Sequence, residues 1–203
     1  MLRVAVLASG RGSNLEALLQ WQHAGTLGAE VVLVLCNRAG AGALEVSARN
    51  GVEATVCKQG NGQDRESAQM EMSARLEDRG VQLVVTAGYD RVLAPGFVRR
   101  WEGKAMNVHP SLLPAFGKSL HAQAEALKHG VKIAGCTVHF ITEDVDGGPI
   151  IAQAAVPVLP EDDLASLSAR ILEQEHRLLP EAVRAYARGR LLIQGRTVSY
   201  AGG

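Results

Sequence analysis

The stretch NVHPSLLP, residues 107–114, places a side-chain amide and an imidazole two positions apart, at Asn107 and His109. Side chains at positions i and i+2 of a β-strand lie on the same face, so both can point at one ligand. Pro110 ends the strand because it cannot donate to the ladder, which puts the pair at the carboxyl end, where open α/β sheets bind ligands. Their N–H groups together could stabilise an oxyanion developing on a carbonyl, whereas a lone histidine would more often be a packed core residue.

A second polar stretch, TEDVDGGP at residues 142–149, carries three carboxylates before a double glycine. An acidic run of this kind is by default a solvated loop, and its spacing does not fit a calcium-binding loop. If the loop folds back over the strand that bears His109, a carboxylate could orient the imidazole or accept a proton. The candidates are Glu143, Asp144 and Asp146.

The glycine-rich stretch SGRGSN, residues 9–14, lies between an apolar run and a helical pattern. Glycines there let backbone N–H groups approach a ligand, and the helix N-terminus favours an anion. A dinucleotide site is disfavoured because Leu15 replaces the third glycine and no acidic residue ends the run at 29–37. A single phosphate is the better interpretation, with an ordinary tight turn as the alternative. The GKS at 117–119 is no P-loop, since Leu112 stands where the first glycine belongs.

Alternation of apolar runs with helical patterns predicts a parallel sheet covered on both faces in the first half of the chain. Strands are expected at 2–9, 29–37, 52–57, 81–88 and 104–110, and helices at 14–25, 42–51, 64–80 and 120–130, with Asp64 as an N-cap. The second half adds an antiparallel hairpin at 132–142 and 148–158, a long helix at about 162–189, and a small terminal hairpin around Gln194 and Gly195. The expected fold class is therefore α/β, a Rossmann-like open twisted sheet with an antiparallel hairpin and long helix in its C-terminal half.

The bulk composition indicates one globular domain, 1–203. Its 203 residues are 47% hydrophobic and 21% charged, enough to bury a full core. The formal net charge of +0 provides no long-range attraction for nucleic acid or an anionic membrane. The longest apolar runs fall far below the ~18 residues of a membrane span. Three widely spaced cysteines without a CxxC pair argue against a disulfide framework or zinc site and favour a reducing cytosol.

Nearly the whole chain resembles the formyltransferase family that uses 10-formyltetrahydrofolate. The resemblance is carried by VAVLASGRGSNLEALL, NVHPSLLPAF, GCTVHFITEDVDGGPIIAQAAVPV and LEQEHRLLP. The combination of NVHPSLLP with a later DGGP is specific to folate-formyl enzymes. The GRGSN turn and the chain length favour the branch that formylates a ribonucleotide.

The resemblance implies a catalytic set of Asn107, His109 and Asp146. The amine of glycinamide ribonucleotide would attack the formyl carbon, while Asn107 and a protonated His109 stabilise the tetrahedral oxyanion. Asp146 would hold the imidazole and an ordered water for proton transfer. No metal is expected, because electrostatic stabilisation and proximity can carry acyl transfer from an activated donor.

The resemblance also implies two binding regions, so that residues 1–103 form a phosphate-binding half and 104–203 a catalytic and folate-binding half. The substrate phosphate would lie on Gly12, Ser13 and Asn14, with Glu175 on the glycinamide or ribose side. Asp90 stands where the family has an apolar residue. The co-substrate 10-formyltetrahydrofolate would contact Arg65, Asp90, Arg91, Val92, Leu93, Asn107, Thr142, Glu143, Asp144 and Val145.

Three other functions are compared with this one. A formyltetrahydrofolate deformylase, a hydrolase, would share the Asn-His-Asp set but usually carries an extra N-terminal domain, and this chain begins at its first strand. A transferase acting on tRNA would need a further C-terminal domain and a basic surface. A non-catalytic phospholigand-binding module would be marked by loss of Asn107, His109 or Asp146, all of which are present. The expected protein is a cytoplasmic monomer or homodimer acting on small molecules.

Overall fold

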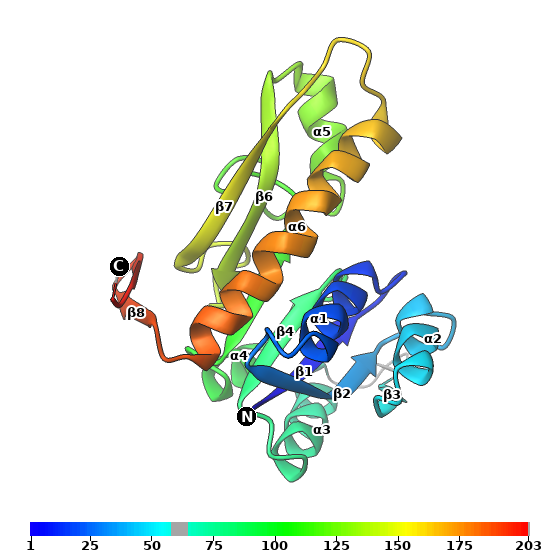
Figure 1. Cartoon of the computed structure of the whole chain (residues 1–203), viewed down its shortest axis with the longest axis vertical. Helices are drawn as coiled ribbons and strands as arrows, with labels where there is room; N and C mark the ends of the chain where they lie inside the picture. Colours follow the sequence, from blue (N-terminus) through cyan, green and yellow to red (C-terminus); the bar gives the residue numbers. More distant parts are fainter. Residues whose placement is uncertain (58–64, 203) are drawn as a thin grey trace.

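The computed structural model describes residues 1–57 and 65–202, and within them the strands form one nine-stranded mixed sheet. Figure 1 shows its parallel part at one end of the molecule and the β6–β7 hairpin at the other. The strand order is β3-β2-β1-β4-β5-β6-β7-β9-β8. The strands are β1 (Leu2–Ala8), β2 (Ala29–Cys36), β3 (Ala54–Val56), β4 (Leu83–Ala87), β5 (Ala105–His109), β6 (Ile133–Phe140), β7 (Ile150–Pro157), β8 (Leu191–Gln194) and β9 (Thr197–Tyr200). The helices are α1 (Ser13–His23), α2 (Gly42–Arg49), α3 (Arg65–Asp78), α4 (Pro95–Arg100), α5 (Ala122–His129) and α6 (Leu164–Ala187).

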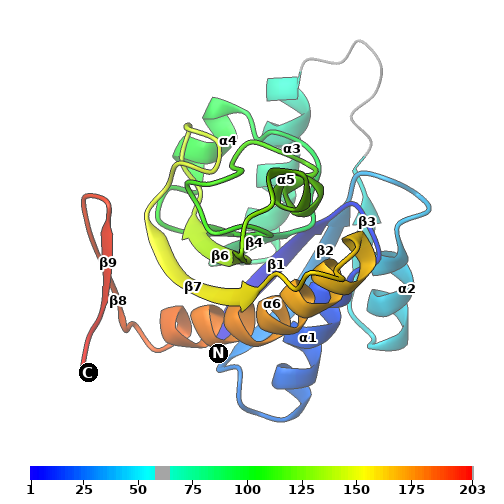
Figure 2. The same cartoon turned by 90° about the horizontal axis from the view of Figure 1, so that it is seen from above.

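The first five strands run parallel, as the alternation of strands and helices predicts, and the direction then reverses. β5 pairs in parallel with β4 and antiparallel with β6, which forms an antiparallel hairpin with β7. The expected α/β class, the parallel N-terminal half and the antiparallel C-terminal hairpin are therefore confirmed. The terminal β8–β9 hairpin projects from the body at the C-terminal end (Figure 2), and its described ladder contact to β7 joins Ile150 to Thr197.

Each face of the sheet buries its own apolar cluster, because near-continuous apolar strands present side chains to both sides. One cluster lies under α1 and α6, which lie side by side in Figure 2, and includes Val6, Met106 and Val108. The other lies under α3 and α4 and includes Leu7 and Phe97. Met106 and Val108 point into the first cluster, so the residues that alternate with them, Asn107 and His109, face the α3 side of the sheet.

One helix was not among the expectations, and one predicted cap is not tested. The helix α4 was not predicted, because six residues that begin with Pro95 are too short to show helical periodicity. The proposed N-cap Asp64 lies outside the described residues. The long helix is confirmed, and its start carries a reciprocal cap: Ser166 N–H donates to Asp163 Oδ1 at 2.8 Å, and Asp163 N–H donates to Ser166 Oγ at 3.0 Å.

Shortening a buried side chain of α6 should destabilise the protein far more than shortening an exposed one on the same helix. Leu167 is 0% exposed, whereas Leu164 is 51% exposed. We expect Leu167→Ala to lower the free energy of unfolding by about 3 kcal/mol, because it removes buried methyl groups and leaves a cavity. Leu164→Ala should change it by less than about 0.5 kcal/mol. Urea denaturation of both variants measures the difference, and equal losses would contradict the packing assigned to α6.

Candidate active site

A row of polar side chains crosses three neighbouring strands. Thr86 of β4 pairs with Asn107 of β5, which pairs with His139 of β6. Thr86 Oγ1 donates to Asn107 Oδ1 at 2.6 Å, and Asn107 Nδ2 lies 3.2 Å from His139 Nε2. His139 Nδ1 lies 2.9 Å from the carbonyl oxygen of Phe140, which can only accept, so Nδ1 carries a proton. Because Asn107 Oδ1 accepts from Thr86, the amide turns its NH₂ towards His139 and keeps one N–H to donate to a ligand.

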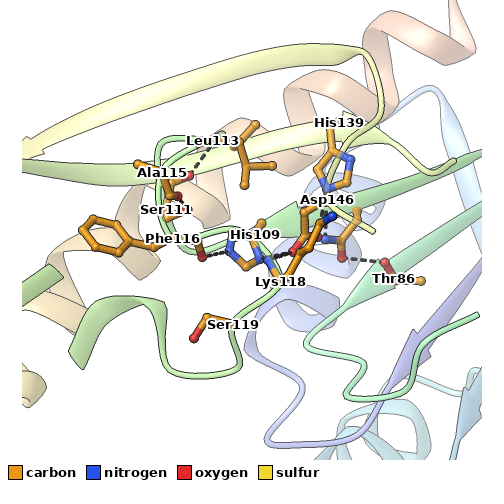
Figure 3. Close-up of polar contacts among 12 residues, drawn as sticks. Thr86, His109, Ser111, Leu113, Ala115, Phe116, Lys118, Ser119, His139 and Asp146 are labelled. Atoms are coloured by element: carbon orange, nitrogen blue, oxygen red, sulfur yellow. Dashed lines mark hydrogen bonds and ion pairs between the residues drawn. The ribbon is translucent and has the colours of Figure 1, made fainter. Parts of the chain in front are cut away.

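Asp146 reaches this row from the β6–β7 connection. The connection leaves β6 beside the start of β5, where Ile141 N–H donates to the Ala105 carbonyl at 2.9 Å, and it then folds back over the sheet face. Asp146 Oδ2 lies 3.5 Å from His109 Nδ1, and Oδ1 lies 3.6 Å from His139 Nε2 (Figure 3). The acidic loop therefore does fold back over the strand that bears His109, and Asp146 is the carboxylate that it brings to the imidazole.

The backbone of this loop is unusual in a way that its sequence explains. Asp146 has φ of 55°, a left-handed conformation that aspartate tolerates better than most residues. A Cβ at Gly147 would overlap the Asp144 carboxylate, and one at Gly148 would overlap the Phe140 carbonyl oxygen. The double glycine therefore lets the loop pass close to β6, and a residue held in a sparsely populated conformation is typical of functional sites.

The segment after Pro110 closes over His109 and Asp146. His109 Nε2 lies 3.1 Å from the carbonyl oxygen of Phe116, and Lys118 N–H donates to Asp146 Oδ2 at 2.7 Å (Figure 3). The carbonyl and the carboxylate beside the imidazole both accept hydrogen bonds. His109 can therefore donate to both neighbours only when both of its ring nitrogens are protonated.

Asp146 is arranged to stay ionised. Burial is the largest influence and by itself raises its pKa, because it disfavours the charged form. Hydrogen bonding from His139, the charge of His109 and the backbone N–H of Lys118 together outweigh burial and bring the pKa below its ordinary value. A buried carboxylate between two imidazoles can hold a positive charge on a neighbouring ring or take part in proton transfer.

The glycine turn and the long helix meet at a separate polar pair. Gly12, with φ of 84°, precedes α1, and a Cβ there would come within 2.7 Å of Ala43 Cα. The first bond of the helix runs from Glu16 N–H to the Gly12 carbonyl, so the N–H groups of residues 13–15 precede that ladder. Asn14 Nδ2 donates to Glu175 Oε2 of α6 at 2.7 Å, so the structure brings together two of the residues expected to bind the substrate.

Glu175 should make stability depend on pH. It is 5% exposed, and burial raises its pKa, partly offset by the hydrogen bond from Asn14. A raised folded-state pKa stabilises the protein below the unfolded value of about 4.3, and this contribution is lost as the pH rises through the folded value. Glu175→Gln cannot ionise, so its stability relative to the wild type should increase from pH 4 upward. Urea midpoints between pH 4 and 8 test this, with Glu173→Gln on the exposed side of α6 as the control; parallel curves for Glu175→Gln and wild type would contradict it.

The residues expected to bind folate lie in two described groups and at one helix end. Arg65 is exposed at the start of α3. In the acidic loop, Glu143 pairs with Arg99 at 2.9 Å and Asp144 with the Lys118 amine at 2.9 Å. Thr142 and Val145 are half-buried in the same loop, and Arg91 and Val92 are exposed while Asp90 and Leu93 are half-buried.

Three contributors to the site were not among its expected residues. They are Thr86, His139 and the backbone N–H of Lys118. The contact of His139 with Asn107 depends on the register between β5 and β6. Among the described residues, no group of three or more His, Cys, Asp or Glu side chains could hold a metal ion, and no helix is long and apolar enough to cross a membrane. Cys136 is buried, and burial raises its pKa to about 12, so it is a core thiol.

Comparison with known proteins identifies the family of this chain. Residues 2–183 match the formyl transferase family, Formyl_trans_N. The phosphoribosylglycinamide formyltransferase of Haemophilus influenzae is 36% identical over 96% of this chain and 91% of that protein. The crystal structure of glycinamide ribonucleotide transformylase 1 from Symbiobacterium toebii has 46% identity and a TM-score of 0.96, covering 98% of this chain and 94% of that one.

The chain also matches one part of much longer proteins. The trifunctional purine biosynthetic protein adenosine-3 of Drosophila melanogaster is 45% identical over 94% of this chain, which spans 14% of that protein's length. The match to the shorter relatives, in contrast, extends over nearly all of both chains. The chain belongs to the formyl transferase family and resembles, within it, the phosphoribosylglycinamide formyltransferases.

Proposed function

We propose that this protein transfers the formyl group of 10-formyltetrahydrofolate to the amine of glycinamide ribonucleotide, a step of purine biosynthesis in the cytoplasm. The observation that carries the proposal is the convergence of Asn107, His109 and Asp146 on one sheet face, within a fold that also presents a helix N-terminus suited to a phosphate. The family and the two named relatives support the same reaction.

The reaction follows from which groups donate and which accept. The amine attacks the formyl carbon, and the carbonyl oxygen becomes an oxyanion in the tetrahedral intermediate. The free N–H of Asn107 donates to this oxygen, and the positive charge of the protonated His109 stabilises it electrostatically, because groups fixed in advance need no reorganisation. Asp146 keeps His109 protonated and, with an ordered water, takes the proton from the attacking amine. Collapse breaks the bond between the formyl carbon and N10 of the folate, which receives the proton.

The binding residues divide the two substrates between different parts of the chain. The phosphate of the ribonucleotide lies at Gly12, Ser13 and Asn14, where helix N–H groups and the helix dipole favour an anion. Glu175, held by Asn14, faces the glycinamide or ribose. The folate lies along the segment 90–93, the acidic loop 142–145 and Arg65.

A spectroscopic assay tests the proposal. The protein is mixed with a 10-formyl folate analogue, and release of the deformylated folate is followed with glycinamide ribonucleotide, with ribose 5-phosphate in its place, and with neither. We expect release only with glycinamide ribonucleotide, since only this compound carries both the amine and the phosphate. Release without any acceptor would indicate a deformylase. No release under any condition would indicate a non-catalytic binding protein and would refute the proposal.

A further inference from the structure

The carboxylate of Asp90 connects the ends of three parallel strands. Asp90 follows β4, Ser9 follows β1, and Asn37 follows β2. Asp90 Oδ1 accepts hydrogen bonds from Ser9 Oγ at 2.9 Å and from Asn37 Nδ2 at 2.7 Å. Its second oxygen forms an ion pair with Arg38, and the side chain is 22% exposed. One side chain therefore links three connections at the carboxyl edge of the sheet.

Ser9 is held to the same segment by backbone groups as well. Asp90 N–H donates to Ser9 Oγ at 2.9 Å, and Ser9 N–H donates to the Gly88 carbonyl at 3.1 Å. Ser9 is 5% exposed. Together with the bond to the Asp90 carboxylate, three hydrogen bonds fix Ser9 against residues 88–90.

These contacts lie between the two regions assigned to the substrates. Ser9 is the first residue of the glycine turn 9–14, and Asp90 is the first residue of the segment 90–93. The far end of that segment is held by the buried Gln69, which donates to the Val92 carbonyl at 3.2 Å and accepts from Ala94 N–H at 2.6 Å. The position of the turn relative to the segment therefore depends on the Ser9–Asp90 bonds.

The surroundings of the Asp90 carboxylate favour its ionised form. Burial, the largest influence, raises its pKa, but hydrogen bonds from Asn37 and Ser9 and the charges of Arg38 and Arg91 bring the pKa below its ordinary value. Asp90 is therefore ionised at neutral pH. Its ion-pair partner Arg38 follows β2 and is exposed.

We propose that Asp90 is a positioning residue for the ribonucleotide: it fixes the phosphate-binding turn 9–14 against the segment 90–93, through Ser9, and so sets the affinity for the phosphate end of the acceptor. This inference rests on the proposed function. It assigns to the Asp90 side chain contacts within the protein rather than a direct contact with folate.

Asp90→Asn tests the inference, because asparagine keeps the size and one acceptor oxygen but loses the charge and the ion pair with Arg38. We expect KM for glycinamide ribonucleotide to rise about tenfold, while kcat and the KM for the formyl folate change less than about threefold, since charge-assisted hydrogen bonds are the stronger ones and only the acceptor's anchor is displaced. Calorimetric titration with the ribonucleotide alone, and with inorganic phosphate alone, should show the same weakening.

Two further variants separate positioning from general stability. Ser9→Ala should raise the same KM, and the double variant should be no worse than the poorer single one, because both substitutions act on the same Ser9–Asp90 contact. Glu53→Gln is the matched control. Glu53 also pairs with an arginine, its Oε1 lying 2.7 Å from Arg79 Nη2. It precedes β3 and therefore lies at the amino end of a parallel strand, whereas Asp90 lies beyond the carboxyl end of one. Glu53→Gln should leave the ribonucleotide KM unchanged.

The outcomes are distinct. Unchanged ribonucleotide and phosphate affinity in Asp90→Asn, a change confined to the folate KM, or multiplicative effects of Ser9→Ala and Asp90→Asn would each overturn the positioning role. A rise in ribonucleotide KM in Glu53→Gln as large as that in Asp90→Asn would also overturn it. A wild-type protein that binds phosphate but neither binds nor formylates glycinamide ribonucleotide would instead refute the proposed function. In that case the phosphate titrations of Asp90→Asn would still test whether Asp90 sets the affinity for phosphate.

Discussion

Asp146→Asn should reduce the formyl-transfer rate by about 10²–10⁴-fold, the range for loss of a positioned proton-transfer group. Asparagine tolerates the left-handed conformation of this position, so the loop should keep its shape. An amide, however, can neither accept the amine proton nor stabilise the charge of His109. Single-turnover rates with saturating substrates measure the effect, and circular dichroism with thermal unfolding checks the fold.

Asp78→Asn provides the matched control for this change, because it makes the same replacement at the exposed end of α3. Its rate should equal that of the wild type. An Asp146→Asn protein that keeps more than about a tenth of the wild-type rate would exclude the carboxylate from proton transfer. The rate of formyl transfer would then depend on His109 and Asn107 alone among the three catalytic residues.

The second large effect is expected at the amide. Asn107→Ala removes one donor to the oxyanion and should lower kcat about 10²–10³-fold, the cost of losing a preorganised donor, with little change in either KM. Thermal stability should also fall, because the truncation leaves Thr86 and the buried His139 without their amide partner. Steady-state kinetics at varied concentrations of both substrates separates kcat from KM.

Thr86→Val distinguishes donation by the amide from its orientation. It removes the Thr86 hydroxyl that holds Asn107 Oδ1. The Asn107 amide remains as the donor, and valine has nearly the size of threonine. We expect a loss in kcat of no more than about tenfold, since His139 still holds the NH₂ end of the amide. A loss as large as that of Asn107→Ala would mean that orientation of the amide dominates its contribution.

The parallel half of the fold could be predicted because apolar runs alternate with helical patterns along most of it. The short α4 could not, since its six residues form fewer than two turns and show no period to detect. Asn107 and His109 were found from alternation along a single strand. Thr86 and His139 required the register between strands, which local sequence does not specify.

Asp146 marks the limit of prediction more sharply. Its neighbours Glu143 and Asp144 are acidic too, and spacing alone does not choose among the three. The choice is made by the loop's return over the sheet and by the positive φ of Asp146, both of which depend on tertiary contacts such as the hydrogen bond from Lys118. The resemblance to a family supplied the assignment that local patterns could not.

The reversal of strand direction after β5 separates the residues that handle the formyl group from the turn assigned to the acceptor. It places Asn107, His109, His139 and Asp146 in one continuous stretch of chain, 107–146, built from adjacent strands and their connections. The turn 9–14, assigned to the acceptor's phosphate, belongs to the first βα unit, which β4 separates from β5 in the sheet. The two regions should therefore be exchangeable independently. Replacing the turn 9–14 should alter which amine is presented, while the residues in 107–146 that handle the formyl group stay in place.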